Sequence, residues 1–363
     1  MMEFTASRAT LVALICLAGS TAGTAWCRSM GAAESASQGD CMSIGQSPYP
    51  KASISNGLVH AIAYLPDPKN GYYRGVRFDW SGVVACLAYE GHTYFGVWFN
   101  HYDPYLHDSI TGPVEEFRSG QGGPLQYDQA KPGELFVKPG VGVLRKIDGG
   151  PFQFATPYPL VDGGRWTVNA RRERVSFRQD LQSSLGIAYV YKKNLKLVKG
   201  QPMLVLEHEL KNTGKQVIDT EVYNHDFFVL DGAPTGPGVV VRFPFDPKAE
   251  SLLKNGARID GKEIVYDREL ESGQAAYGWL TGYSSAVSDF DFIVENRNTG
   301  AGVEESSSLP ISRLNFWSIR TTVCPEGYVH LKILPGQTAR WTIRYRFFSL
   351  SSDQALPGSS MAK

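Results

Sequence analysis

Apolar and polar residues alternate with a period of two along most of the chain, which is typical of half-buried β-strands. The segments 57–65, 203–212 and 339–348 show this pattern best. In the expected strand 203–212, one face carries Leu204, Leu206, His208 and Leu210. In the expected strand 339–348, one face carries Trp341, Ile343 and Tyr345. These faces predict strands that pack against a core on one side.

Turn signals separate these runs. "NTGKQ" (212–216), "APTGPG" (233–238), "KNGARIDGKE" (254–263) and "LPGQ" (334–337) combine Gly, Pro and Asn in the way that tight turns require. The 38 glycines and 21 prolines agree with many strands joined by turns, and helical periodicity is scarce. We therefore expect an all-β protein with a large antiparallel β-sandwich rather than a parallel sheet with crossover helices.

The two ends of the chain differ from its middle. Residues 1–25 have the features of a signal peptide, because Arg8 precedes a short apolar run (9–19) and the small residues of 23–25. Residues 26–50 predict a linker, residues 51–349 one domain, and residues 350–363 a disordered tail. The protein is expected to be secreted or periplasmic, without a membrane segment once the signal is removed.

Charge and cysteine content narrow the possible partners. The 36 basic and 36 acidic residues give a formal net charge of zero, which argues against a nucleic acid or an anionic membrane as partner. Four cysteines follow the signal segment, and an exported protein can form disulfides. We expect a local Cys27–Cys41 bridge, with Cys86 and Cys324 as buried thiols.

Common catalytic motifs are absent: the sequence contains no Gly-rich phosphate loop, no G-x-S-x-G and no H-E-x-x-H. "HYDPYLHD" (101–108) holds two His and two Asp, but no helix or hairpin fixes these side chains on one side. We expect a polar loop there, and no metal site.

Two segments interrupt strand-like patterns with polar residues. In "EVYNHDFFVLDG" (221–232), Asn224, His225 and Asp226 form either a turn or the floor of a site with a proton donor. In "VCPEG" (323–327), Pro325 should break the strand because it cannot donate to a sheet ladder, leaving Glu326 at a strand end facing a cleft. A surface turn is the alternative for Glu326.

Together these motifs resemble the galactose mutarotase (aldose 1-epimerase) superfamily. The resemblance rests on "VYNHDFF" (222–228) followed by "VCPEGYVHLKILPGQ" (323–337) and "WTIRYRF" (341–347), and it extends over about residues 55–348. "RGVRFDWSGVV" (74–84), "GHTYFGVWF" (91–99), "GPVEEF" (112–117) and "KPGVGVLRK" (138–146) look like its earlier strands and loops. The chain departs from the family where Glu115-Glu116-Phe117 replaces an Asn-Arg motif, so it resembles an atypical, exported subgroup.

The resemblance implies a β-supersandwich and a sugar as partner, either a mono- or an oligosaccharide. It implies that His225 is the acid and Glu326 the base of an anomer interconversion that needs no cofactor and no metal. We expect further substrate contacts from the following residues: Arg77, Glu116 and Arg320 to hydroxyls, Asn224 and Asp226 as orienting groups, and Trp279 or Phe228 as a stacking surface. Two alternatives stay open, a non-catalytic carbohydrate-binding protein and a polysaccharide lyase-type enzyme on the same fold.

Overall fold

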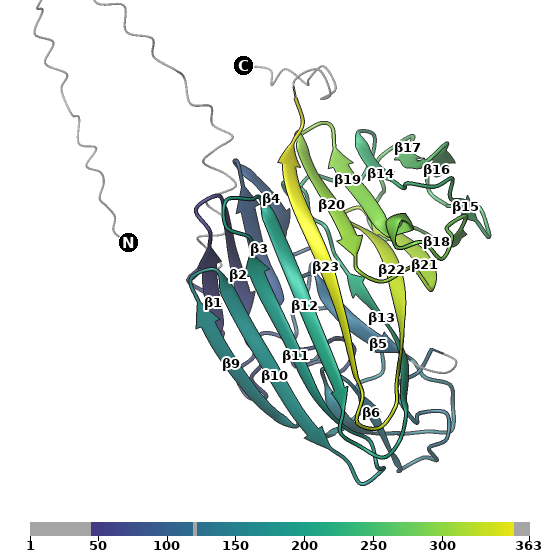
Figure 1. Ribbon diagram of the computed structural model, residues 1–363. Coiled ribbons are helices and arrows are strands. Elements are labelled where there is room, and N and C mark those ends of the chain that lie inside the picture. Colours follow the sequence, from purple (N-terminus) through teal and green to yellow (C-terminus); the bar gives the residue numbers. More distant parts are fainter. Residues whose placement is uncertain (1–44, 119–121, 352–363) are drawn as a thin grey trace, which may run out of the picture. The chain divides into compact units, whose positions relative to one another are not determined.

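The computed structural model describes residues 45–118 and 122–351. Strands dominate this part of the chain, and the pairs between them are antiparallel, so the expected all-β sandwich is confirmed (Figure 1). The predicted signal peptide and the Cys27–Cys41 bridge lie outside the described residues, as do most of the linker and nearly all of the tail.

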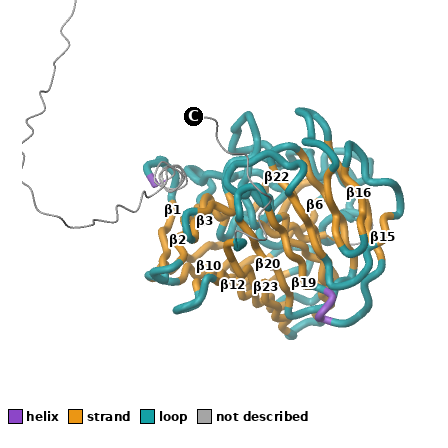
Figure 2. Tube along the Cα trace, turned by 90° about the horizontal axis from the view of Figure 1, so that it is seen from above, coloured by secondary structure: helices purple, strands orange, loops and turns teal. Residues whose placement is uncertain are grey.

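One layer of the sandwich is a ten-stranded sheet, whose long central strands form one row in Figure 2. In spatial order its strands are β16 (Ala257–Asp260), β17 (Glu263–Tyr266), β14 (Val239–Arg242), β19 (Asp291–Asn296), β20 (Ala301–Ser307), β23 (Thr338–Ser349), β12 (Met203–Asn212), β11 (Ala188–Leu197), β10 (Arg174–Gln182) and β9 (Arg165–Arg171).

The opposite layer joins a six-stranded and a four-stranded sheet. The first has the order β15 (Lys248–Ala249), β18 (Ala275–Thr281), β21 (Arg313–Ile319), β22 (Thr322–Ile333), β13 (Ile218–His225) and β5 (Val114–Arg118). The second has the order β1 (Lys51–Ser55), β2 (Val59–Tyr64), β3 (Val83–Tyr89) and β4 (His92–Phe95). Isolated bridges connect the two through Phe95, Phe228 and Val323.

A small third sheet holds β6 (Leu135–Lys138), β7 (Gly142–Arg145) and β8 (Leu160–Asp162), and a short 3-10 turn, η1 (Val287–Asp289), precedes β19. Within the described residues, no helix is long and apolar enough to cross a membrane.

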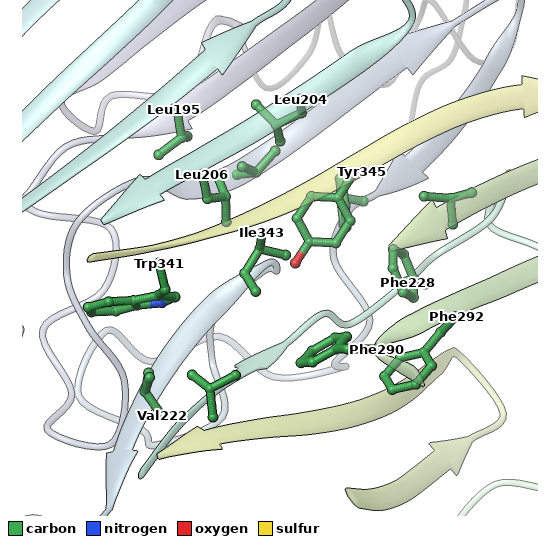
Figure 3. Close-up of a cluster of buried hydrophobic side chains, with 14 of the residues drawn as sticks. Leu195, Leu204, Leu206, Val222, Phe228, Phe290, Phe292, Trp341, Ile343 and Tyr345 are labelled. Carbon is green, nitrogen blue, oxygen red and sulfur yellow. The ribbon is translucent and has the colours of Figure 1, made fainter. Parts of the chain in front are cut away.

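The core lies between the two large layers. The apolar faces predicted from alternation are buried there, including Leu206 of β12 and Ile343 of β23, which pair with each other across the two strands (Figure 3). Val222 and Phe228 meet them from the opposite layer (Figure 3). Fully burying one such side chain stabilises the fold by about 1.5–3 kcal/mol. Packing on this face therefore fixes which side chains of β13 and β22 point inward and which point away from the core.

The prediction of a strand break at Pro325 is wrong, because β22 runs through it without interruption. The ladder between β13 and β22 ends at the pair Tyr223–Tyr328 and resumes only as the bridge Phe228–Val323. Pro325 lies in the gap between these pairs, where β13 requires no backbone donor.

The two described cysteines differ from each other. Cys324 is a free, buried thiol, as predicted, and its Sγ accepts the backbone N–H of Phe227 at 3.2 Å. The prediction for Cys86 is wrong, because that residue is disulfide-bonded. Burial alone does not distinguish a thiol from a disulfide in a strand.

Candidate active site

The register of two neighbouring strands, β13 and β22, brings His225 and Glu326 together. Tyr223 of β13 pairs with Tyr328 of β22, and two residues further along each antiparallel strand His225 faces Glu326. Side chains two residues apart share a face of a sheet, so Tyr223 and His225 lie on the same face of β13. Val222, between them in sequence, is in the inter-sheet core, so the face that carries His225 points away from this core. The distance between His225 Nε2 and Glu326 Oε1 is 3.3 Å.

Aromatic rings enclose the imidazole. The His225 ring stacks on Phe227 with centroids 3.7 Å apart, and Trp317 meets its edge at 5.3 Å. Phe227 has a φ of 46°, an uncommon backbone conformation for a bulky residue, and it holds its ring beneath His225 just after β13 ends. His225 and Glu326 are each only 4% exposed.

One polar side chain orients the carboxyl group. Asn315 pairs with Glu326 in the β21–β22 ladder, and its Nδ2 donates to Glu326 Oε2 at 2.8 Å. His225 Nδ1 is buried and has no partner among the described residues. One hydrogen-bonding position of the imidazole is therefore left for a ligand or water.

Burial controls the protonation of the pair. It raises the pKa of Glu326 to about 7. Burial, followed by the positive charge of Arg77, holds the pKa of His225 well below its usual value. Although the distance meets the criterion of an ion pair, these directions make the contact one between a neutral imidazole and a carboxyl group that is protonated below about pH 7. Below that pH the pair holds one titratable proton.

Glu116 is the centre of a second polar group on the same face. It lies beside Tyr223 in the β5–β13 ladder, and its Oε2 accepts the Tyr223 hydroxyl at 2.6 Å. Three cations surround it, with nitrogen to oxygen distances of 3.0 Å for Arg77, 3.2 Å for Arg118 and 3.2 Å for Lys138. Burial would raise the pKa of Glu116, but these cations hold it well below its usual value. Burial lowers the pKa of Lys138 to about 8.

Arg77 links this group to the loop 101–109. Its guanidinium donates to Asp108 and lies 4.2 Å from the ring centroid of Phe154. Burial raises the pKa of Asp108, but Arg77 and the hydrogen bond from His107 together outweigh burial, so the net shift is downward. The loop expected to be only polar thus supplies a charged partner to the site, although the described residues hold no group of His, Cys, Asp and Glu suited to a metal.

Of the other predicted residues, Trp279 shares the face of the pair. It pairs with Asn315 across β18 and β21, and the guanidinium carbon of Arg313 lies 4.2 Å from its ring centroid. The half-buried indole is therefore two strands away from Glu326.

Four predicted contacts lie elsewhere. Asn224 and Asp226 alternate with His225, so they point into the inter-sheet core, where Asn224 donates to Glu115 at 3.3 Å and Asp226 accepts from Tyr345 at 2.7 Å. Phe228 is buried in that core. Arg320 occupies the turn between β21 and β22, and its guanidinium binds Glu269 at 2.6 Å. Strand alternation and the turn separate these side chains from His225.

Sequence reasoning missed Asp108, Asn315, Tyr223 and Lys138. Tyr223 had a local signal, because it is two residues before His225 and shares its face. The other three come from separate segments and meet the site only through the fold.

No family model matches the chain, and no curated protein matches it. Solved structures do. A protein of Synechocystis superposes with a TM-score of 0.52 at 14% identity, covering 84% of this chain and 97% of the other. An aldose 1-epimerase candidate from Escherichia coli gives 0.52 at 10% identity, with 83% and 99% covered. A galactose mutarotase-like protein from Clostridium acetobutylicum gives 0.50 at 13% identity, with 82% and 95% covered. The chain therefore has the galactose mutarotase-like fold.

Proposed function

We propose that the protein interconverts the anomers of a sugar by acid–base catalysis at His225 and Glu326. One observation carries the proposal: two titratable side chains from β13 and β22 meet at 3.3 Å on the face that points away from the core. The fold of sugar-epimerase-like structures supports it, although a shared fold does not by itself give an activity.

The reaction needs one group that accepts the proton of the C1 hydroxyl and one that donates a proton to the ring oxygen. The C1–O5 bond then breaks, the open chain rotates about C1–C2, and the ring closes on the other face as both protons return. A pair that holds a single titratable proton meets this requirement, because the protonated member can donate and the other member can accept. The pKa directions favour Glu326 as the proton donor and His225 as the acceptor in the free protein, the reverse of the assignment that the family resemblance implies.

The polar group around Glu116 supplies the surroundings. Arg77 lies close enough to lower the pKa of His225. Its guanidinium nitrogens donate to Glu116, Asp108 and Tyr223, and the N–H groups left over can donate to sugar oxygens. Trp279 offers a half-buried aromatic surface on the same face. In this conformation His225 and Glu326 touch, so a sugar ring binds between them only after the two side chains separate.

The direct contact also favours the second candidate, a sugar-binding protein without catalysis. A lyase-type reaction is less well supported. Tyr223, Arg77 and His225 do lie together, but the Tyr223 hydroxyl already donates to Glu116, and burial holds its pKa well above the usual value. Export to the periplasm or the medium stays part of the proposal.

Polarimetry on freshly dissolved glucose and galactose tests the activity. His225→Asn and Glu326→Gln should each lower the rate of anomer interconversion by about 10²–10⁴-fold, the usual contribution of a positioned acid or base. The matched controls are His60→Asn on β2 and Glu271→Gln, whose side chain is 75% exposed. Catalytic function is rejected if both site variants are as fast as the wild type, whereas sugar binding without rate enhancement supports the second candidate.

A further inference from the structure

A groove of about 690 Å³ lies beside the start of β13 and is separate from the His225–Glu326 pair. Arg118, Asp219, Glu221 and His330 line it, together with Gln129 and the exposed Val217. Its volume is within the range of small-molecule sites, which is roughly 300–1,000 Å³. Nothing in the proposed reaction uses it.

Strand register places this groove in line with the pair. Glu221 pairs with Arg118 on β5 and with His330 on β22, so the three form a row across the sheet. The next row contains Tyr223, and the row after it contains His225 opposite Glu326. Because a strand rises about 3.3 Å per residue, the four steps along the strand from Glu221 to His225 span about 13 Å. That distance is longer than one sugar ring.

Arg118 connects the groove to the site. Its guanidinium lines the groove and also donates to Glu116, the centre of the polar group beside His225. Its Nε is buried and has no hydrogen-bond partner among the described residues. A buried donor of this kind is normally satisfied, which points to an acceptor supplied by a ligand or water at the inner end of the groove.

The lining has the chemistry of a binding site for hydroxyl groups. The carboxylates of Asp219 and Glu221 already contact His330 and Arg313, and their remaining lone pairs can accept hydroxyl hydrogens. Gln129 and Arg118 can donate. The lining disfavours an anionic polymer, because it holds three carboxylates, from Asp128, Asp219 and Glu221, whereas the Arg118 guanidinium is already paired with Glu116. Val217 adds an apolar patch for the carbon face of a ring.

We propose that the groove binds the outer units of a neutral oligosaccharide whose reducing-end unit reaches His225 and Glu326. The proposal rests on the proposed function and narrows its substrate from a sugar of unspecified length to a short sugar chain. Arg118 is then a specificity residue shared by the two parts of the site, because it contacts Glu116 on one side and the groove on the other.

The test compares glucose and galactose with maltotetraose, cellotetraose and β-1,4-galactotetraose. We expect the kcat/KM for anomer interconversion of at least one tetrasaccharide to exceed that of its monosaccharide about tenfold. Val217→Trp, which fills the groove, should abolish this gain and leave the monosaccharide rate unchanged. Val161→Trp is the matched control, since Val161 is an exposed strand valine of β8 outside the groove.

Calorimetric titration with the three tetrasaccharides separates this proposal from the proposed function. One outcome is that no sugar is turned over, while a tetrasaccharide binds the wild type but not Val217→Trp. The groove then binds oligosaccharides as proposed, and the proposed enzymatic function is rejected. If monosaccharides are turned over while none of the tetrasaccharides gains rate or affinity, the groove proposal is overturned and the function stands. Equal tetrasaccharide binding by Val217→Trp and wild type also overturns it.

Discussion

A single proton determines what His225 and Glu326 can do. Burial raises the pKa of Glu326 to about 7 and lowers that of His225, so below pH 7 the carboxyl group is protonated beside a neutral imidazole. If the proton moved from Glu326 to His225, the pair would hold the same titratable proton but carry two opposite charges. The environment of the two side chains decides which of these two forms is more stable. The enclosing rings of Phe227 and Trp317 favour the uncharged form, because a low-dielectric environment penalises both charges.

The protonation of the pair predicts the pH dependence of turnover. As the pH rises through about 7, Glu326 loses the proton that the pair must donate while His225 is already neutral, so kcat/KM should fall above that pH. Polarimetry between pH 5 and 9, corrected for the rate of buffer alone, measures it. A rate that keeps rising from pH 7 to 9 would show that Glu326 acts as an ionised base and that the reversed assignment is wrong.

The strands themselves were largely predictable. Alternation in 203–212 and 339–348 identified β12 and β23 and the faces that they bury, because packing against one core enforces a period of two. The same rule, applied to β13, places Asn224 and Asp226 on the face opposite to His225. Pro325 could not be judged from local sequence, since its effect depends on whether the neighbouring strand needs a donor at that point. Asp108 and Asn315 depend on tertiary contacts in the same way.

A close approach of two elements positions the end of β13. A Cβ atom at Gly112, just before β5, would lie 1.8 Å from the carbonyl oxygen of Asp226. We expect Gly112→Ala to lower the free energy of unfolding by about 3 kcal/mol, at the upper end of the cost of overpacking, because backbone rather than a flexible side chain must move. Urea unfolding measures the loss.

The matched control for this close approach is Gly149→Ala, where an added Cβ meets nothing within 4 Å. That change should alter stability by less than about 1 kcal/mol and can be stabilising, since alanine restricts the unfolded chain. Equal effects of the two substitutions would show that the approach to Asp226 does not constrain the strand end.

The two layers are also joined by charge, directly behind the candidate site. Glu115 of β5 forms an ion pair with Lys193 of β11, and both of these side chains are fully buried. Glu115 also accepts a hydrogen bond from His208 Nε2 of β12 at 2.8 Å. Burial would raise the pKa of Glu115, but Lys193 and His208 lower it to about 2. Glu115 also accepts from Asn224, the residue before His225, so this contact connects the ten-stranded sheet to the strand end that carries the imidazole.

Removing one partner of this ion pair should cost far more than removing both. Lys193→Met leaves the Glu115 carboxylate buried without its cation, and we expect a loss of about 3–5 kcal/mol in the free energy of unfolding. The double variant Glu115→Gln/Lys193→Met should recover most of that loss, because the glutamine amide keeps an acceptor for Asn224 and leaves no charge. Lys192→Met is the matched control on the same strand, where an exposed pair with Glu209 contributes at most about 1 kcal/mol. If urea unfolding gives Lys193→Met and Lys192→Met the same stability, the buried charge does not hold the layers together, and apolar packing between the sheets alone positions His225.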